Sequence, residues 1–321
     1  MEESSHTAVT GYALGALAAA TYGTNPLFAL PLLHAGIDAM TVLFLRYFFA
    51  IPLLALIMVA RGRGFGLRRG QVVPVMVMGI LMALSSLTLY VSYAYIGAAI
   101  ASTLLFIYPI LVTLIMAVCF GERPSLLTIA SIVLALTGIA LLYRGEGGVT
   151  LAWQGLLLVA LSALSYAIYL VGVNRPGLKE IPTLKLTLYV ISSGLLLFAF
   201  SFDTSCFAVL GQRPVLWLCA FGMALFPTAL SLISTSAAIQ RIGSTPVAIM
   251  GALEPVTAVA IAVMLFSEVL TLRLAIGMVL VIVAVTMIIA HDAIAQAGSN
   301  LIHTLLRMRK MFPRLPRKRK K

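Results

Sequence analysis

Two ionisable side chains lie deep inside long apolar stretches of the chain. Arg46 stands in Leu-Phe-Leu-Arg-Tyr-Phe-Phe, and Glu254 stands in Gly-Ala-Leu-Glu-Pro-Val. A charge at the centre of a bilayer costs roughly 2.5–3.5 kcal/mol on insertion scales, so such residues persist where they are paired, hydrated or functional. Three arrangements are open for Arg46 and Glu254: an ion pair, a shared aqueous cavity, or a structural role in bonding loosened backbone.

Small polar and phenolic side chains recur at helical spacing in other apolar stretches. Residues three or four apart share one face of a helix, where hydroxyl groups mostly serve packing and hydrogen bonding between helices. A buried phenol also needs a partner, which makes the tyrosines candidates for contact with a solute. The residues that we expect to join Arg46 and Glu254 in substrate binding or coupling are Tyr22, Asn25, Tyr90, Tyr108, Ser165, Tyr166, Ser231 and Thr235.

Prolines interrupt three of these stretches. Proline has no N–H to donate and its ring clashes with the carbonyl four residues earlier, so Pro255 predicts a kinked or loosened helix from Gly251 to Glu254. Pro109 holds the matching position in an earlier stretch, and Pro26 predicts a further break near the N-terminus. Interrupted helices at matched positions of two halves point to a binding site at the membrane midplane. The alternative is that these prolines only curve the helices for packing.

The composition identifies the elements that must position these residues. Hydrophobic residues make up 61% of the 321 residues and charged residues 10%, against roughly 45–50% and about 25% in soluble domains. A helix needs about 20 apolar residues to cross a bilayer. The sequence therefore predicts an all-α polytopic membrane protein with ten transmembrane helices, at about 8–32, 37–60, 72–93, 97–119, 125–143, 153–173, 183–202, 214–238, 244–266 and 270–291.

The chain repeats itself. Gly97, Pro109 and Glu122 recur 146 positions later as Gly243, Pro255 and Glu268. At a shift of 144, Gly11, Thr21 and Tyr22 correspond to Gly155, Ser165 and Tyr166. Ten helices then form two repeats of five, and because five is odd, the second repeat must be inverted. We expect repeats at 1–148 and 149–291, followed by a basic tail at 292–321.

The positive charges predict the orientation. With both termini in the cytoplasm, 18 of the 22 Lys and Arg residues fall in inner loops or the tail, while the outer loops hold Arg144, Arg213 and Arg273. We therefore expect a multi-pass protein of the cell inner membrane. The net charge of +12 follows from this topology and from contact of the tail with membrane lipid, so it does not indicate nucleic-acid binding.

The repeated blocks resemble a known family. Gly97 to Glu122, and Leu-Glu-Pro-Val through Glu268, are similar to the EamA-type unit of the drug/metabolite transporter superfamily, as is Arg46 with the Tyr-Phe-Phe-Ala that follows it. The resemblance covers about residues 8–290. The second repeat lacks a counterpart of Arg46 near Val190, and Ser267 replaces the family's usual glycine. The resemblance implies a ten-helix inner-membrane protein that moves small organic solutes, often amino acids or related metabolites, and frequently outward.

The expected function is secondary transport by alternating access around a midplane cavity. Arg46 would attract a carboxylate or tune Glu254, and Glu254 is the candidate for proton coupling. We expect no cofactor and no metal, since the four histidines are scattered at His6, His34, His291 and His303. A passive channel or a sensor without transport is the alternative. An intramembrane enzyme lacks its usual motifs here, so we expect no catalytic activity.

Overall fold

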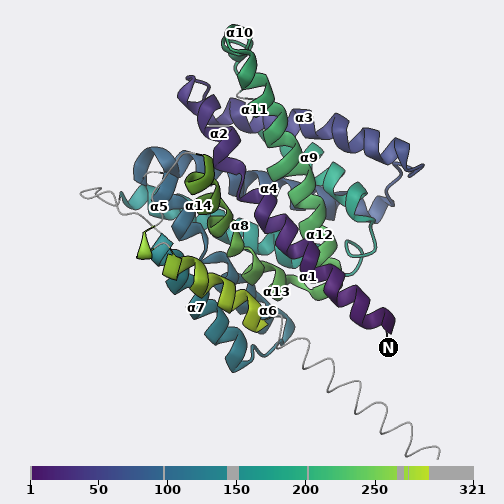
Figure 1. Cartoon of the computed structure of the whole chain (residues 1–321). Helices are drawn as coiled ribbons and strands as arrows, with labels where there is room; N and C mark the ends of the chain where they lie inside the picture. Colours follow the sequence, from purple (N-terminus) through teal and green to yellow (C-terminus); the bar gives the residue numbers. More distant parts are fainter. Residues whose placement is uncertain are drawn as a thin grey trace, which may run out of the picture.

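The computed structural model describes residues 2–96, 98–142, 152–200, 202–265, 271–273 and 275–288, and these residues form helices and turns without a strand (Figure 1). Several predictions concern positions outside the described residues. These positions are Gly97, Arg144, Ser267, Glu268, His291, His303, the repeat boundary at 148/149 and the tail at 292–321.

The first half contains seven helices where five apolar stretches were predicted, because two stretches are interrupted. The segment predicted at 8–32 is divided into α1 and α2, and the segment at 97–119 into α5 and α6. The bounds are α1 Glu2–Tyr22, α2 Asn25–His34, α3 Ala39–Ala60, α4 Arg69–Ile96, α5 Ala98–Leu105, α6 Tyr108–Phe120 and α7 Leu126–Leu142.

The second half is interrupted at partly different places: the segment predicted at 153–173 is the continuous helix α8, whereas the segment at 244–266 is divided into α13 and α14. A short helix, α10, lies in the connection before the segment predicted at 214–238, and that segment contains a π-helical turn, η1. The bounds are α8 Trp153–Val173, α9 Thr183–Ala199, α10 Cys206–Gln212, α11 Pro214–Ala224, η1 Leu225–Leu230, α12 Ser231–Ile242, α13 Ser244–Met250 and α14 Leu253–Leu265, with a further helix at Ala275–Ile288.

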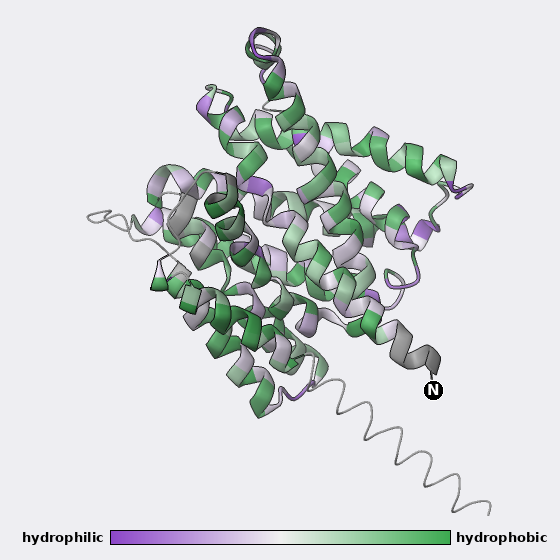
Figure 2. Cartoon of the chain, viewed as in Figure 1, coloured by the Kyte–Doolittle hydropathy of each residue, from purple (hydrophilic) through white to green (hydrophobic). Residues whose placement is uncertain are grey.

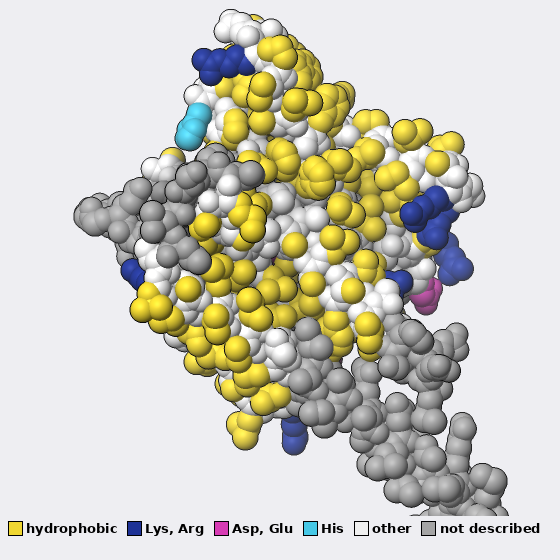
Figure 3. Space-filling model, in the orientation of Figure 1, with side chains coloured by type: hydrophobic (Ala, Val, Ile, Leu, Met, Phe, Trp, Pro, Cys, Tyr) yellow, Lys and Arg dark blue, Asp and Glu magenta, His cyan; other side chains and the backbone are white. Residues whose placement is uncertain are grey.

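The molecule has the surface of a membrane protein. Five helical stretches are long and apolar enough to cross a bilayer, and four shorter apolar helices accompany them. Figure 2 shows that hydrophobic residues dominate the helices, and in Figure 3 hydrophobic side chains cover most of the visible face while Lys and Arg lie near its margins. Leu126 is 86% exposed and Arg46 is 0% exposed. Because water does not tolerate so extensive an apolar surface, the chain is a multi-pass membrane protein.

Four uninterrupted helices pack together at the centre. Helix α4 lies against α8 and α9, and α9 also packs against α3 (Figure 1). Glycine allows the close approach of α4 and α9: a Cβ added to Gly79 would lie 2.5 Å from the carbonyl oxygen of Val190 and 2.6 Å from Cβ of Ser193. Since lipid tails are as apolar as leucine, membrane helices associate through this kind of close contact. We call α3, α4, α8 and α9 the central frame.

The Gly79→Ala variant is expected to destabilise the central frame by about 1–3 kcal/mol, the usual cost of overpacking. The added methyl group would meet backbone of α9, which cannot move aside without separating the two helices. Thermal unfolding of the purified protein in detergent measures the effect. Gly172→Ala is the matched control, because its Cβ would meet only the flexible side chain of Met78. Equal melting temperatures for the two variants would contradict this account.

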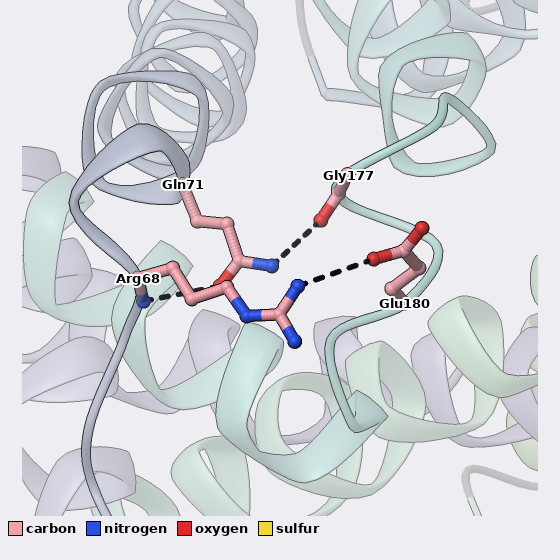
Figure 4. Close-up of polar contacts among 4 residues, drawn as sticks. All are labelled: Arg68, Gln71, Gly177 and Glu180. Carbon is pink, nitrogen blue, oxygen red and sulfur yellow. Dashed lines mark hydrogen bonds and ion pairs between the residues drawn. The ribbon is translucent and has the colours of Figure 1, made fainter.

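Polar contacts join the connection after α3 to the connection after α8. Nη1 of Arg68 lies 3.8 Å from Oε2 of Glu180, and Nε2 of Gln71 donates to the carbonyl of Gly177 at 3.1 Å (Figure 4). Nζ of Lys185 also donates to the carbonyl of Gly66 at 2.9 Å. An exposed ion pair contributes little to stability. Together, however, these contacts hold residues 61–71 beside residues 174–185 at one end of the bundle.

Candidate functional site

Four of the apolar segments are interrupted, and residues at or near these breaks form the candidate site. The breaks lie at Gly23–Thr24, Phe106–Ile107, η1 and Gly251–Ala252. Pro26 and Pro109 each lie in the first turn of the helix that follows the break. The backbone N–H groups of a first turn have no partner within the helix, so a proline there removes no hydrogen bond. Pro255 is the third residue of α14. The interruption at η1 contains Pro227, which was not among the predicted breaks although its residue type gave the same signal. Single π-helical turns often occur at functional sites.

Glu254 lines two cavities. The large cavity, of about 130 Å³, is bounded by the breaks of α1–α2 and α5–α6, by α4 and by the start of α14. The small cavity, of about 10 Å³, has room for about one water molecule and lies between α1, α6, α8, α12 and the break of α13–α14. Glu254 therefore belongs to the walls of two spaces, each bounded by its own set of helices.

Two aromatic side chains line the small cavity. The rings of Tyr108 and Tyr166 meet edge to face with their centroids 4.9 Å apart, and both line this cavity. A Cβ added to Gly251 would collide with the hydroxyl group of Tyr108, so the glycine lets the phenol approach the break between α13 and α14. Movement of Tyr108 or Tyr166 would change the size of the space beside Glu254.

Arg46 bonds the π-helical turn. Its Nε donates to Oγ1 of Thr228 at 2.6 Å, and its Nη2 donates to the carbonyl of Pro227 at 3.0 Å. Its guanidinium carbon lies 5.4 Å from the ring centroid of Tyr22, while Nη1 has no partner among the described residues. Thr228 in turn donates to the carbonyl of Met223 at 2.8 Å. Arg46 thereby links α3 to the loosened backbone of η1 and to the end of α1.

Arg46 and Glu254 do not form an ion pair, which was one of the arrangements left open by the sequence. Arg68 with Glu180 is the ion pair found among the described residues. Tyr22 lies between the two charges, because its ring is beside Arg46 and it lines the large cavity together with Glu254. Arg46 lines neither cavity. Arg46 therefore bonds residues of the π-helical turn, whereas Glu254 borders the two cavities.

Of the eight other candidate residues, five line one of the cavities and three line neither. Tyr22 and Asn25 line the large cavity, and Tyr108, Tyr166 and Thr235 line the small one. Tyr90 does not line the large cavity but bonds a residue that does: Nδ2 of Asn25 donates to the Tyr90 hydroxyl at 3.1 Å. Ser231 donates to the carbonyl of Ala18 at 3.1 Å and so joins α12 to α1, while Ser165 is buried on α8 and lines neither cavity.

The polar and aromatic residues of these walls that sequence reasoning did not name as site residues are Tyr93, Ser102 and Phe106. Tyr93 is three residues after Tyr90, so the shared face of α4 was a usable signal. Phe106 comes just before the break that Pro109 introduces. Gly251 lies four residues before Pro255, at the start of the segment predicted to be loosened, whereas no local signal distinguishes Ser102 from the many other small residues of the chain.

Comparison with known proteins adds a family. Residues 9–144 and residues 153–290 each match the EamA-like transporter family. A protein of Archaeoglobus fulgidus described as an uncharacterized transporter is 27% identical over 281 residues, which span 86% of this chain and 94% of that protein. A solved crystal structure superposes with a TM-score of 0.73 and 18% identity over 86% of this chain and 97% of its own. At that identity the likeness shows the fold alone.

Proposed function

Because the chain belongs to the EamA-like transporter family and carries that family's domain twice, we propose that it is a secondary transporter of small organic solutes. Its substrates are amino acids or related metabolites, and it exports them across the cell inner membrane. The observation that carries this proposal is the position of Glu254, an acidic residue that lines two cavities among interrupted helices. Broken helices of this kind are where secondary transporters place their substrate and ion sites.

The proposed topology has ten spans in two inverted repeats, at 1–148 and 149–291, with both termini and the tail at 292–321 in the cytoplasm. Contacts between connections support it. Residues 61–71 lie beside residues 174–185, and residues 122–125 share a pocket of about 280 Å³ with residues 242–246. In a ten-span arrangement, the connections after the second, fourth, sixth and eighth spans all lie on one side.

Accessibility labelling tests this topology directly. Single cysteines at positions 122 and 268, in a chain whose Cys119, Cys206 and Cys219 have been replaced by serine, are expected to react with a membrane-impermeant reagent from opposite sides. The physical reason is that an odd number of spans per repeat inverts equivalent positions. Reaction of both cysteines from the same side would refute the inverted arrangement, and alternating access between the repeats with it.

In the proposed transport cycle, helices of the two inverted repeats rock around the cavities beside Glu254. The large cavity gives access to Glu254 from one side, while Tyr108 and Tyr166 close the small cavity. Separation of these two rings would give access from the other side. Glu254 would carry the coupling proton through this exchange, and Arg46 would hold η1 and Tyr22 in place while the neighbouring helices move.

The proposal is tested in two steps. Metabolite levels in cells with and without the protein identify the solute, and proteoliposomes preloaded with that solute then measure exchange. Saturable counterflow supports a carrier. Leak that saturates at no concentration and needs no solute on the opposite side indicates a passive channel, and absence of any solute movement indicates a sensor; either result would overturn the proposal.

A further inference from the structure

The charge inside the two cavities is of one sign. Glu254 is the ionisable carboxylate that lines both, and no Lys, Arg or His of the described residues lines either one. Arg46 lines neither cavity: its guanidinium group lies beside the ring of Tyr22, and its Nε and Nη2 donate to Thr228 and Pro227. The wall that a solute meets in the large cavity therefore includes one acidic residue, Glu254, and no basic residue of the described chain that would neutralise a negative group of the solute.

The walls of the large cavity are suited to a cation. Tyr22, Tyr93 and Phe106 line it together with Glu254. The ring of Tyr93 is stacked on that of Tyr90 at 5.2 Å, which fixes its position. The faces of aromatic rings attract ammonium groups, most strongly where water is excluded. Since Arg46 already lies beside Tyr22, the aromatic attraction on a bound cation falls mainly on Tyr93 and Phe106.

We infer that the large cavity binds the ammonium group of a small organic cation, with Glu254 as its counter-charge and Tyr93 and Phe106 against its apolar part. The inference rests on the proposed function and names the chemical class of its substrate: solutes that carry an ammonium group, and not solutes whose only charge is a carboxylate. The cavity volume of about 130 Å³ restricts the class to small metabolites, since the pockets that hold drug-sized ligands measure about 300–1,000 Å³.

A set of three probes of nearly equal shape tests the charge preference. Choline carries a quaternary ammonium group, 3,3-dimethylbutan-1-ol has carbon in place of the nitrogen, and 3,3-dimethylbutanoate has a similar apolar group with a negative charge. Isothermal titration of the purified full-length chain in lipid nanodiscs gives the dissociation constants. Choline is expected to bind at least tenfold more tightly than either of the others. Equal or tighter binding of the alcohol or the anion would overturn the inference.

Variants connect the preference to the cavity. Glu254→Gln is expected to remove the advantage of choline over the alcohol, whereas Glu122→Gln, which changes an exposed carboxylate outside both cavities, should preserve it. Tyr93→Phe retains the ring and should bind choline within about twofold of the wild type, while Tyr93→Leu should weaken binding several-fold. Melting curves verify that each variant is folded. A choline preference that survives Glu254→Gln would refute the assignment.

Transport assays separate this inference from the proposed function. Saturable counterflow of a solute whose only charge is a carboxylate would overturn the substrate class and leave the transporter proposal standing. Binding with the expected choline preference in a protein that exchanges no solute would support the cation site and overturn the transporter proposal.

Discussion

Replacement of Glu254 by glutamine is expected to reduce pH-driven transport to the rate of protein-free vesicles while the protein remains folded. Glutamine has almost the same shape as glutamate, but it cannot bind and release a proton. Glu254 has no ion-pair partner among the described residues, so the substitution leaves no opposite charge unpaired. An imposed pH gradient across proteoliposomes, with the solute inside, measures the effect on solute efflux.

Two further variants make this result specific. Glu254→Asp keeps a carboxylate between the two cavities and is expected to retain pH-driven transport at a reduced rate. Glu122→Gln removes a carboxylate from an exposed turn and is expected to transport like the wild type. If Glu254→Gln shows the same dependence on the pH gradient as the wild type, Glu254 has no role in proton coupling.

Replacement of Arg46 by methionine is expected to abolish transport without lowering the melting temperature. A buried guanidinium group loses several kcal/mol of hydration. Its hydrogen bonds to Thr228 and Pro227 return about 1.5–3 kcal/mol each. Because these quantities nearly cancel, stability should change little. The η1 turn and Tyr22 would lose the group that holds them, however, and the wall of the large cavity would lose its shape. Transport and thermal unfolding are measured on the same preparation.

Lysine at position 46 separates charge from geometry. It keeps the positive charge, but its single ammonium group does not reproduce the planar set of donors that arginine offers to Thr228 and Pro227. Arg46→Lys is therefore expected to slow transport at least tenfold, equivalent to about 1.4 kcal/mol. Arg175→Met is the control: Arg175 lies over the ring of Phe120, away from both cavities, and its loss should leave transport unchanged. Full activity of Arg46→Lys would show that charge alone matters.

The class of the protein could be predicted from local properties of the chain. A sequence that is 61% hydrophobic in runs of about 20 residues forms helices in a bilayer, because no other open structure satisfies its backbone there. The duplication could also be predicted, because it appears directly in the sequence as a constant spacing between residues of the same types. The family matches at 9–144 and 153–290 agree with it. Prolines indicate candidate interruptions for the same reason, since a missing N–H depends on the residue itself. Pro52 and Pro74, however, lie inside the continuous helices α3 and α4, so packing decides which candidates become breaks.

The relation between Arg46 and Glu254 could not be predicted in this way. Each residue was identified from its apolar surroundings, but whether the two charges meet depends on which helices pack together. In the structure Tyr22 lies between them, and Arg46 bonds a carbonyl in a π-helical turn more than 180 residues away. A charge in an apolar run indicates that some partner exists, whereas its identity depends on packing.

Hydropathy also could not show which faces of the helices line the cavities. Lipid tails are as apolar as a protein interior, so the hydropathy of a large apolar residue does not show whether it faces lipid or protein. Val118 and Val112 on α6 illustrate this: one is 75% exposed and the other fully buried. The chain alone therefore predicted a helical, duplicated membrane protein with charges at its centre. The walls around Glu254 were decided by the tertiary structure alone, because they form where separate helices pack together and hydropathy does not show which apolar residues meet there.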